Sequence, residues 1–135
     1  RSLGEKALVE MMKDPRSKFS HISYQLGRLV ELRVQYRAFH PNGEQKVLLL
    51  SNDVFSVLRV SPEGEEHILC LTNVANKVSR VQVAFSEIGV DEAHWYDLFG
   101  KRGWVAKGNK LDVSLQPYDV IWLIPFVELE RIIES

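Results

Sequence analysis

His40 is the first residue to weigh as a site of proton transfer, because histidine changes charge near neutral pH. It stands in the stretch AFHPNG at residues 38–43. A catalytic histidine needs an orienting partner and a nucleophile or substrate within reach. Here Pro41, Asn42 and Gly43 follow it, and these residue types end a helix and turn the chain. We therefore interpret the stretch as a turn, and we expect no catalytic residue in it.

The other reactive residue types form no recognisable catalytic or metal-binding pattern. His21, His67 and His94 lack metal-ligand spacing. The acidic run EGEE at 63–66 lies in an expected hairpin loop, where a solvated turn is the better interpretation than an acid–base pair. No glycine-rich phosphate loop, paired CxxC motif or nucleophile elbow is present in the sequence. We expect no catalytic residue, no metal site and no cofactor.

Cys70 is the only cysteine, so no disulfide can form within the chain. A single cysteine fits the reducing cytoplasm, which is where we expect the protein. The residue lies in the apolar run HILCLTNV. We expect a buried strand position with an inert thiol.

The three tryptophans offer aromatic faces on which a sugar could stack. Trp122 lies in an apolar run and is expected in the core. Trp104 stands beside a turn in KRGW and is the tryptophan expected to be most exposed, while Trp95 is expected near one end of a sandwich. Trp104 and Trp95 are therefore the candidate carbohydrate-binding residues. The competing interpretation is that Trp104 packs over the edge of a sheet and that Trp95 helps to close the end of the sandwich.

Composition narrows the function classes. The chain has 135 residues, of which 45% are hydrophobic and 26% charged, typical of one globular domain. A formal net charge of −1 argues against a nucleic-acid partner. No apolar run is long enough to cross a membrane, so we expect no membrane partner. The sequence starts at Arg1 rather than methionine, and we expect it to be part of a larger protein.

The hydrophobic period changes near Pro41. Before it, residues 20–39 show helical spacing, with Ser20 as the expected N-cap, and a weaker helical stretch covers EKALVEMM at 5–12. After Gly43 the period is two, as in SRVQVAF at 79–85 and LDVSL at 111–115. Turn residues separate the apolar runs, and SPEGEE at 61–66 is typical of a hairpin loop. The expected fold is mainly β: an antiparallel, Greek-key-like sandwich of seven to eight strands preceded by one or two helices.

Three segments follow from this change of period. We expect a helical segment over residues 1–42, an antiparallel β-domain over 43–126 and a tail over 127–135. The runs VLLL at 47–50 and VIWLI at 120–124 have no polar side. An antiparallel strand with one wet face alternates apolar and polar residues, so both runs are expected to be covered on both faces. One cover is the opposing sheet, and the other is either the N-terminal helix or a part of the protein absent from this sequence.

Five stretches, taken in order, resemble the C-terminal end of enzymes of the α-amylase superfamily, glycoside hydrolase family 13, and most nearly the sucrose phosphorylase group. They are AFHPNGEQKVL, VFSVLRVSP, ILCLTNV, WYDLFGK and LQPYDVIWL, and the resemblance covers about residues 20–125. The AFHPNG element joined to Phe55 and Arg59 is the part most specific to the phosphorylase-like branch. Phe99 stands where a small residue often precedes the glycine, a mild departure from the pattern.

The resemblance implies that residues 20–39 are the last helix of a (β/α)₈ barrel and that HPNG leads out of that barrel. The matched framework positions of the β-domain, none of them catalytic, are Asn73, Asp97, Pro117, Tyr118 and Trp122. The catalytic carboxylates of the family lie on barrel strands, and by this resemblance all of them precede Arg1. The parent enzyme would be a retaining glycosidase or a glucoside phosphorylase.

Our leading hypothesis is thus a non-catalytic C-terminal domain that stabilises the catalytic barrel of the same polypeptide. The alternatives are a carbohydrate-binding module and a free-standing interaction domain. A homodimer of this chain is a further expectation, because the apolar stripe of the helix, with Ile22, Leu26, Leu29 and Val30, would lack its barrel partners.

Overall fold

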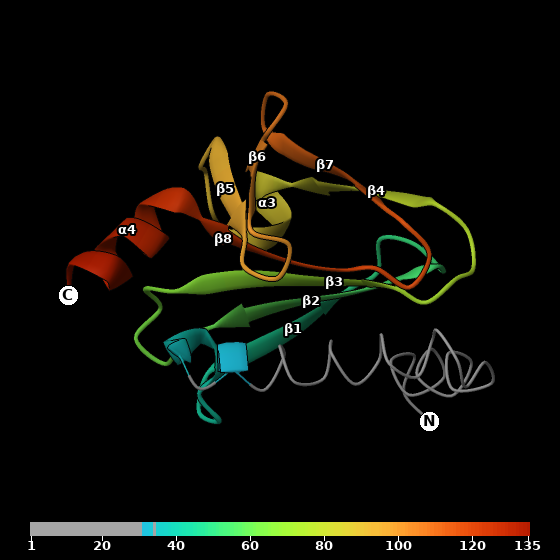
Figure 1. Ribbon diagram of the computed structural model, residues 1–135. Helices are drawn as coiled ribbons and strands as arrows, with labels where there is room; N and C mark the ends of the chain where they lie inside the picture. Colours follow the sequence, from blue (N-terminus) through green and yellow to red (C-terminus); the bar gives the residue numbers. More distant parts are fainter. Residues whose placement is uncertain (1–30, 34) are drawn as a thin grey trace.

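The computed structural model describes residues 31–33 and 35–135. Within this part of the chain there are eight strands, with η1 before the first, α3 between the fourth and fifth, and α4 after the last (Figure 1). The elements are η1 (Arg37–Phe39), β1 (Glu44–Leu48), β2 (Val54–Val60), β3 (His67–Asn73), β4 (Ser79–Ala84), α3 (Phe85–Ile88), β5 (His94–Asp97), β6 (Arg102–Val105), β7 (Lys110–Leu115), β8 (Val120–Pro125) and α4 (Phe126–Glu134). The mainly β, antiparallel fold expected from the sequence is confirmed.

The strands form two sheets that face one another. The larger sheet has six strands in the order β1-β2-β3-β8-β5-β6, and the smaller pairs β4 with β7. All of these pairs are antiparallel. The SPEGEE stretch joins β2 to β3 as a hairpin, with Val60 opposite His67, as the turn residues predicted.

One core lies between the two sheets. In β4, Val81 and Val83 are buried while Arg80 and Gln82 are exposed, which is the alternation expected of a half-buried strand. The same pattern in β7 buries Leu111, Val113 and Leu115. These side chains meet the inner face of the large sheet, so the small sheet closes one side of the sandwich.

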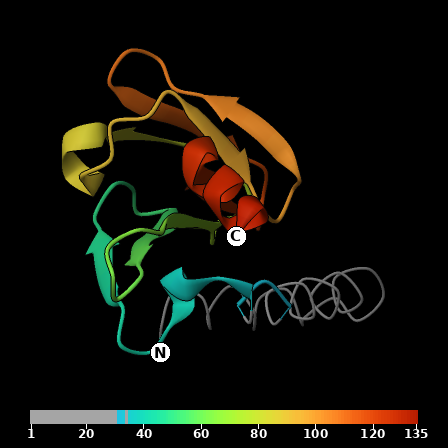
Figure 2. The same cartoon turned by 90° about the vertical axis from the view of Figure 1, so that its left-hand side faces the viewer.

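A second core covers the outer face of the large sheet. It contains Leu32, Ala38 and Leu129 together with the outward-facing residues of β8. Figure 2 shows η1 and α4 on this side, separated from β4 and β7 by the sheet. Strand β8 therefore has Ile121 and Leu123 in one core and Trp122 and Ile124 in the other, and the prediction that it is covered on both faces is confirmed.

At residues 47–50 the described part of this chain covers one face only, so cover of the other face by a part of the protein outside this sequence stays a prediction. Leu48 is buried, but Val47 is 49% exposed and Leu49 is 96% exposed. The physical reason is position, because β1 is an edge strand of the sheet and its outer side lies beyond the segments that cover β3 and β8.

The ends of the β-domain also differ from expectation. Residues 31–33 and 35 are helical, but Tyr36 is extended (φ −119°, ψ 132°) and η1 follows as a separate 3₁₀ turn. The helix predicted to reach residue 39 thus ends four residues earlier. The part of that helix over residues 20–30 lies outside the described residues, and so does the helix expected at 5–12. Residues 127–135, expected as a tail, mostly belong to α4, whose Leu129 is buried.

Candidate functional site: the junction at residues 33–41

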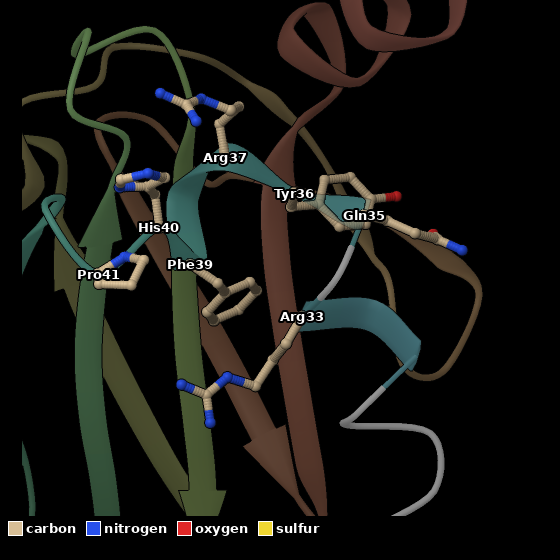
Figure 3. Close-up of a pocket in the computed structure, with 7 residues that line it drawn as sticks. All are labelled: Arg33, Gln35, Tyr36, Arg37, Phe39, His40 and Pro41. Carbon is tan, nitrogen blue, oxygen red and sulfur yellow. The ribbon is translucent and has the colours of Figure 1, made fainter.

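The chain enters the β-domain across the outer face of the large sheet, through residues 33–41. A cavity of about 280 Å³ opens here. Figure 3 shows Phe39 pointing toward the sheet, with Arg33 extending below its ring and Arg37 and Gln35 pointing away from it. The residues that line this cavity are Arg33, Gln35, Tyr36, Arg37, Phe39, His40 and Pro41.

His40 belongs to the turn itself. Its ring Nδ1 accepts a hydrogen bond from the Asn42 N–H at 3.0 Å, and its carbonyl accepts one from the Gly43 N–H at 2.9 Å. A Cβ at Gly43 would lie 2.3 Å from the Val60 carbonyl oxygen, so only glycine lets the turn approach β2 this closely. With one ring nitrogen bonded to its own turn, His40 acts in the local backbone geometry, as the residue types predicted.

Arg59 holds this turn from the neighbouring strand. Its Nε donates to the Ala38 carbonyl at 3.3 Å, one Nη donates to the His40 carbonyl at 3.4 Å, and the other Nη donates to the Gln45 side chain. A guanidinium is suited to this role because it presents several donors in one rigid plane. Arg59, one of the residues that carried the family resemblance, therefore has a structural role at this turn.

Phe39 anchors the segment to β8. Its ring centroid lies 4.7 Å from that of Trp122, tilted by 37°, a favourable aromatic arrangement. The guanidinium carbons of Arg33 and Arg59 each lie 5.9 Å from the Phe39 centroid, at the outer limit of a cation–π contact.

An ionic cluster flanks the junction where α4 meets the start of β3. The buried Glu128 accepts the His67 backbone N–H at 2.6 Å and lies 2.8 Å from His67 Nδ1. Burial raises the pKa of Glu66, whose side chain accepts the Ala38 N–H at 3.4 Å. A carboxylate bonded to a histidine supplies two of the three members of a catalytic triad, and the third is a nucleophile. In the part of the chain that the structure describes, no hydroxyl or thiol is hydrogen-bonded to His67, so the triad is incomplete there.

The two candidate sugar-binding tryptophans lie side by side on β5 and β6, as cross-strand partners. Trp95 is 1% exposed and its Nε1–H donates to the Glu92 carbonyl at 2.7 Å, so its ring presents no face to a ligand. Trp104 is half-buried and packs against the inner core, with the Arg102 guanidinium 4.8 Å from its ring. The expectation that Trp104 is the most exposed of the three tryptophans is confirmed. The Arg102 guanidinium, however, already lies over its ring, where a sugar would otherwise stack. Sugar binding at this position stays a prediction.

Cys70 is half-buried on β3 rather than fully buried as expected; it pairs with Trp122 in the register with β8 and, like Phe39, packs against the outer core. Burial raises the pKa of its thiol to about 12. A thiol with so high a pKa holds almost no thiolate at neutral pH, and the thiolate is the reactive form. The expectation of an inert thiol agrees with this geometry.

Among residues 31–33 and 35–135, no three histidine, cysteine or acidic side chains group closely enough to hold a metal ion. Within the same residues, no helix combines the length and apolar character needed to cross a membrane.

The sequence alone matches no known protein family and no curated protein. The fold, in contrast, matches solved glycosidases. The crystal structure of AmyP in complex with maltose aligns with a TM-score of 0.68 at 17% identity, covering 81% of this chain and 21% of that chain. The chain has the fold of one part of these α-amylases.

Other α-amylases give the same result. The Anoxybacillus α-amylase aligns with a TM-score of 0.61 at 16% identity, over 72% of this chain and 20% of its own. The α-amylase of Geobacillus thermoleovorans, solved with acarbose, aligns with a TM-score of 0.59 at 11% identity, over 69% and 20%. The chain thus spans about a fifth of the length of the structures that it matches. At such low identities the likeness concerns the fold alone.

Two features of the junction escaped the sequence-based analysis. One is the contact of Glu128 with His67, which depends on α4. The spacing of Phe126, Leu129 and Ile133 in the last ten residues was an available helical signal for that element. The other is the pairing of Arg33 with Arg59 around one ring, which no local spacing encodes because the two residues lie on different elements.

Proposed function

We propose that this chain is the non-catalytic β-domain of an α-amylase-type enzyme acting on α-glucosides, and that it stabilises the catalytic barrel of the same polypeptide. The proposal rests on comparing two numbers: the share of this chain that aligns with the α-amylases, and the share of each α-amylase that this chain accounts for. Most of this chain aligns with α-amylases, yet it accounts for only about a fifth of each of them. An activity of the whole enzyme would thus reside mainly in chain that this sequence lacks.

The junction supports the same proposal. Residues 38–40 are held to the sheet by Arg59, by the Phe39–Trp122 contact and by Glu66. A segment held at this many points suits a fixed attachment of this domain to further chain. We also propose that the parent enzyme is most similar to the sucrose phosphorylase group. This part of the proposal rests on the AFHPNG element together with Phe55 and Arg59.

The test is whether residues 1–135 turn over a substrate. Purified chain incubated with sucrose, maltooligosaccharides or a glucosyl phosphate is expected to release no glucose or phosphate above the buffer level. Turnover that follows the protein through purification, and that persists in an independent preparation, would contradict a non-catalytic role.

A further inference from the structure

A second cavity on the outer face of the large sheet, of about 230 Å³, is bordered by two arginines and by no carboxylate. Arg33 and Arg59 border it, and the Phe39 ring lies within 5.9 Å of both guanidinium carbons. The two positive charges are therefore within twice that distance of one another. The other lining residues are Gln45, Val57, Cys70 and Trp122.

Neither arginine has its charge balanced within the described chain. Two different arginines do form ion pairs in the described chain: Arg37 with Glu63, and Arg80 with Asp112. In contrast, Arg59 donates only to neutral carbonyl and amide oxygens. Arg33 is exposed and, among the described residues, has no ion pair with a carboxylate; its guanidinium lies beside the Phe39 ring. The cavity is therefore a local centre of positive potential.

Cys70, another residue that lines the cavity, is affected by the same charges. Burial raises the pKa of its thiol, while the charges of Arg59 and Arg33 act in the opposite direction by favouring the thiolate. Both guanidinium groups thus act electrostatically on one lining residue from their separate elements.

Arg59 is already held in position for a ligand. Three of the five N–H groups of an arginine side chain are used by the bonds to Ala38, His40 and Gln45, which leaves two donors on a guanidinium whose place is fixed. Figure 3 shows Arg33 extending below the Phe39 ring toward the neighbouring strands. An exposed arginine beside a fixed one gives a charge-assisted site in which only one side chain has to be ordered.

We propose that this cavity binds a small oxyanion of the phosphate class between Arg33 and Arg59. Its volume is below the range of about 300–1,000 Å³ usual for drug-sized ligands, so a free ion or the phosphate group of a larger molecule fits better than a whole saccharide. The arginine pair favours an oxyanion over chloride, because planar guanidinium groups match pairs of oxygen acceptors. This proposal is independent of the enzyme to which the domain belongs.

The test is a titration of the ¹⁵N-labelled chain with inorganic phosphate, compared with sodium chloride at the same ionic strength. We expect saturable shifts of the Phe39 and Cys70 amides and of the Trp122 indole N–H in the millimolar range of phosphate, and no saturation with chloride. Arg33→Met should weaken phosphate binding at least tenfold without unfolding the chain, since Arg33 is exposed and forms no structural hydrogen bond in the described chain. The matched control, Arg80→Met, removes an exposed arginine from the opposite sheet and should bind like the wild type.

Three results would overturn the proposal. Equal shifts with chloride would reduce the effect to screening of surface charge. Unchanged phosphate affinity in Arg33→Met would remove the arginine pair as its cause. Binding of acetate with no binding of phosphate would assign the cavity to carboxylates, such as an acidic side chain from another part of the polypeptide.

Discussion

Asp97 is a buried carboxylate that organises the turn between β5 and β6. It is 1% exposed, and its Oδ1 accepts the N–H groups of Phe99 at 3.0 Å and Trp122 at 3.1 Å. Burial raises the pKa of this carboxyl above its ordinary 3.8, although the backbone N–H groups of Gly100, Trp122 and Phe99 oppose that rise. A Cβ at Gly100 would lie 2.3 Å from the Asp97 Oδ2, which explains the glycine of this turn.

Replacing Asp97 tests this role. Asp97→Ala leaves buried N–H groups without an acceptor and is expected to lower the free energy of unfolding by about 2–4 kcal/mol. Asp97→Asn keeps an acceptor oxygen and should cost less. Because the folded pKa is raised, the folded state binds more protons just above pH 3.8, so the wild type should gain stability relative to Asp97→Asn as the pH falls toward that value. Urea denaturation at several pH values measures this difference, and a difference that does not vary with pH would contradict it.

Asn73 joins the end of β3 to two loops. It is fully buried; its Nδ2 donates to the carbonyls of Lys77 at 2.8 Å and Gln116 at 2.9 Å, and its Oδ1 accepts the Ala75 N–H at 3.0 Å. Asn73→Asp would replace the donor with an acceptor facing carbonyl oxygens. We expect a loss of at least about 3 kcal/mol in the free energy of unfolding.

The matched control for that change is Asn76→Asp, an exposed residue of the same loop. It should leave the thermal midpoint nearly unchanged. Similar midpoints for the two variants would show that the amide of Asn73 has no particular structural role.

The importance of Asn73 and Asp97 could be expected from the family resemblance but not from local spacing. Their hydrogen-bond partners, such as Gln116 for Asn73 and Trp122 for Asp97, are remote in sequence. In contrast, the turn at His40 was predictable, because Pro41, Asn42 and Gly43 restrict the backbone through their own chemistry. Sequence patterns report local backbone preferences well and distant side-chain contacts poorly.

At the scale of elements, α4 is attached to the sheet by both apolar and polar contacts. Leu129 packs in the outer core, and Glu128 binds His67 through two contacts. Glu128→Ala should lower the free energy of unfolding by about 1–3 kcal/mol and speed amide exchange in α4 more than in β3. Glu130→Ala, an exposed change on the same helix, is the control. Equal exchange rates in both variants would mean that packing alone holds α4.

The junction makes a separate prediction. Arg59→Met removes the donors to Ala38, His40 and Gln45, so the amides of residues 38–43 should exchange faster and trypsin should cleave sooner after Arg37. Arg80→Met should not change either measurement, because Arg80 lies on the small sheet. If exchange in β3 and β8 rises as much as at residues 38–43, the junction is not held separately from the core.

The strands differ in how far their sequences predicted them. β4 and β7 alternate regularly because one face is wet, and β8 is apolar throughout because both faces are covered. The run at residues 47–50 is also apolar, but it starts at the end of β1, an edge strand, and the apolar run alone does not show that the strand is at an edge. α4 was missed because its apolar spacing was short and followed directly after β8.

At the scale of the whole molecule, apolar side chains remain exposed at the end of β1 and just after it. Leu49 and Val47 are 96% and 49% exposed, and leaving such area in water is unfavourable by about 25 cal/mol per Å². We expect the isolated chain to self-associate at micromolar concentration, and Leu49→Glu to shift it toward monomer in sedimentation experiments. The helical stripe through Leu29, which also led us to expect pairing, lies outside the described residues. A wild-type monomer would contradict this prediction.

The central claim is that this domain belongs to a longer, α-glucoside-acting polypeptide and supports its catalytic part. The most direct measurement is to capture the natural protein with an antibody against residues 43–126, then to record its intact mass and its activity on α-glucosides. The account predicts a polypeptide several times longer than 135 residues that hydrolyses or phosphorolyses an α-glucoside, while residues 1–135 alone are inert. A captured protein of about the length of this chain, or a long one without such activity, would contradict the account.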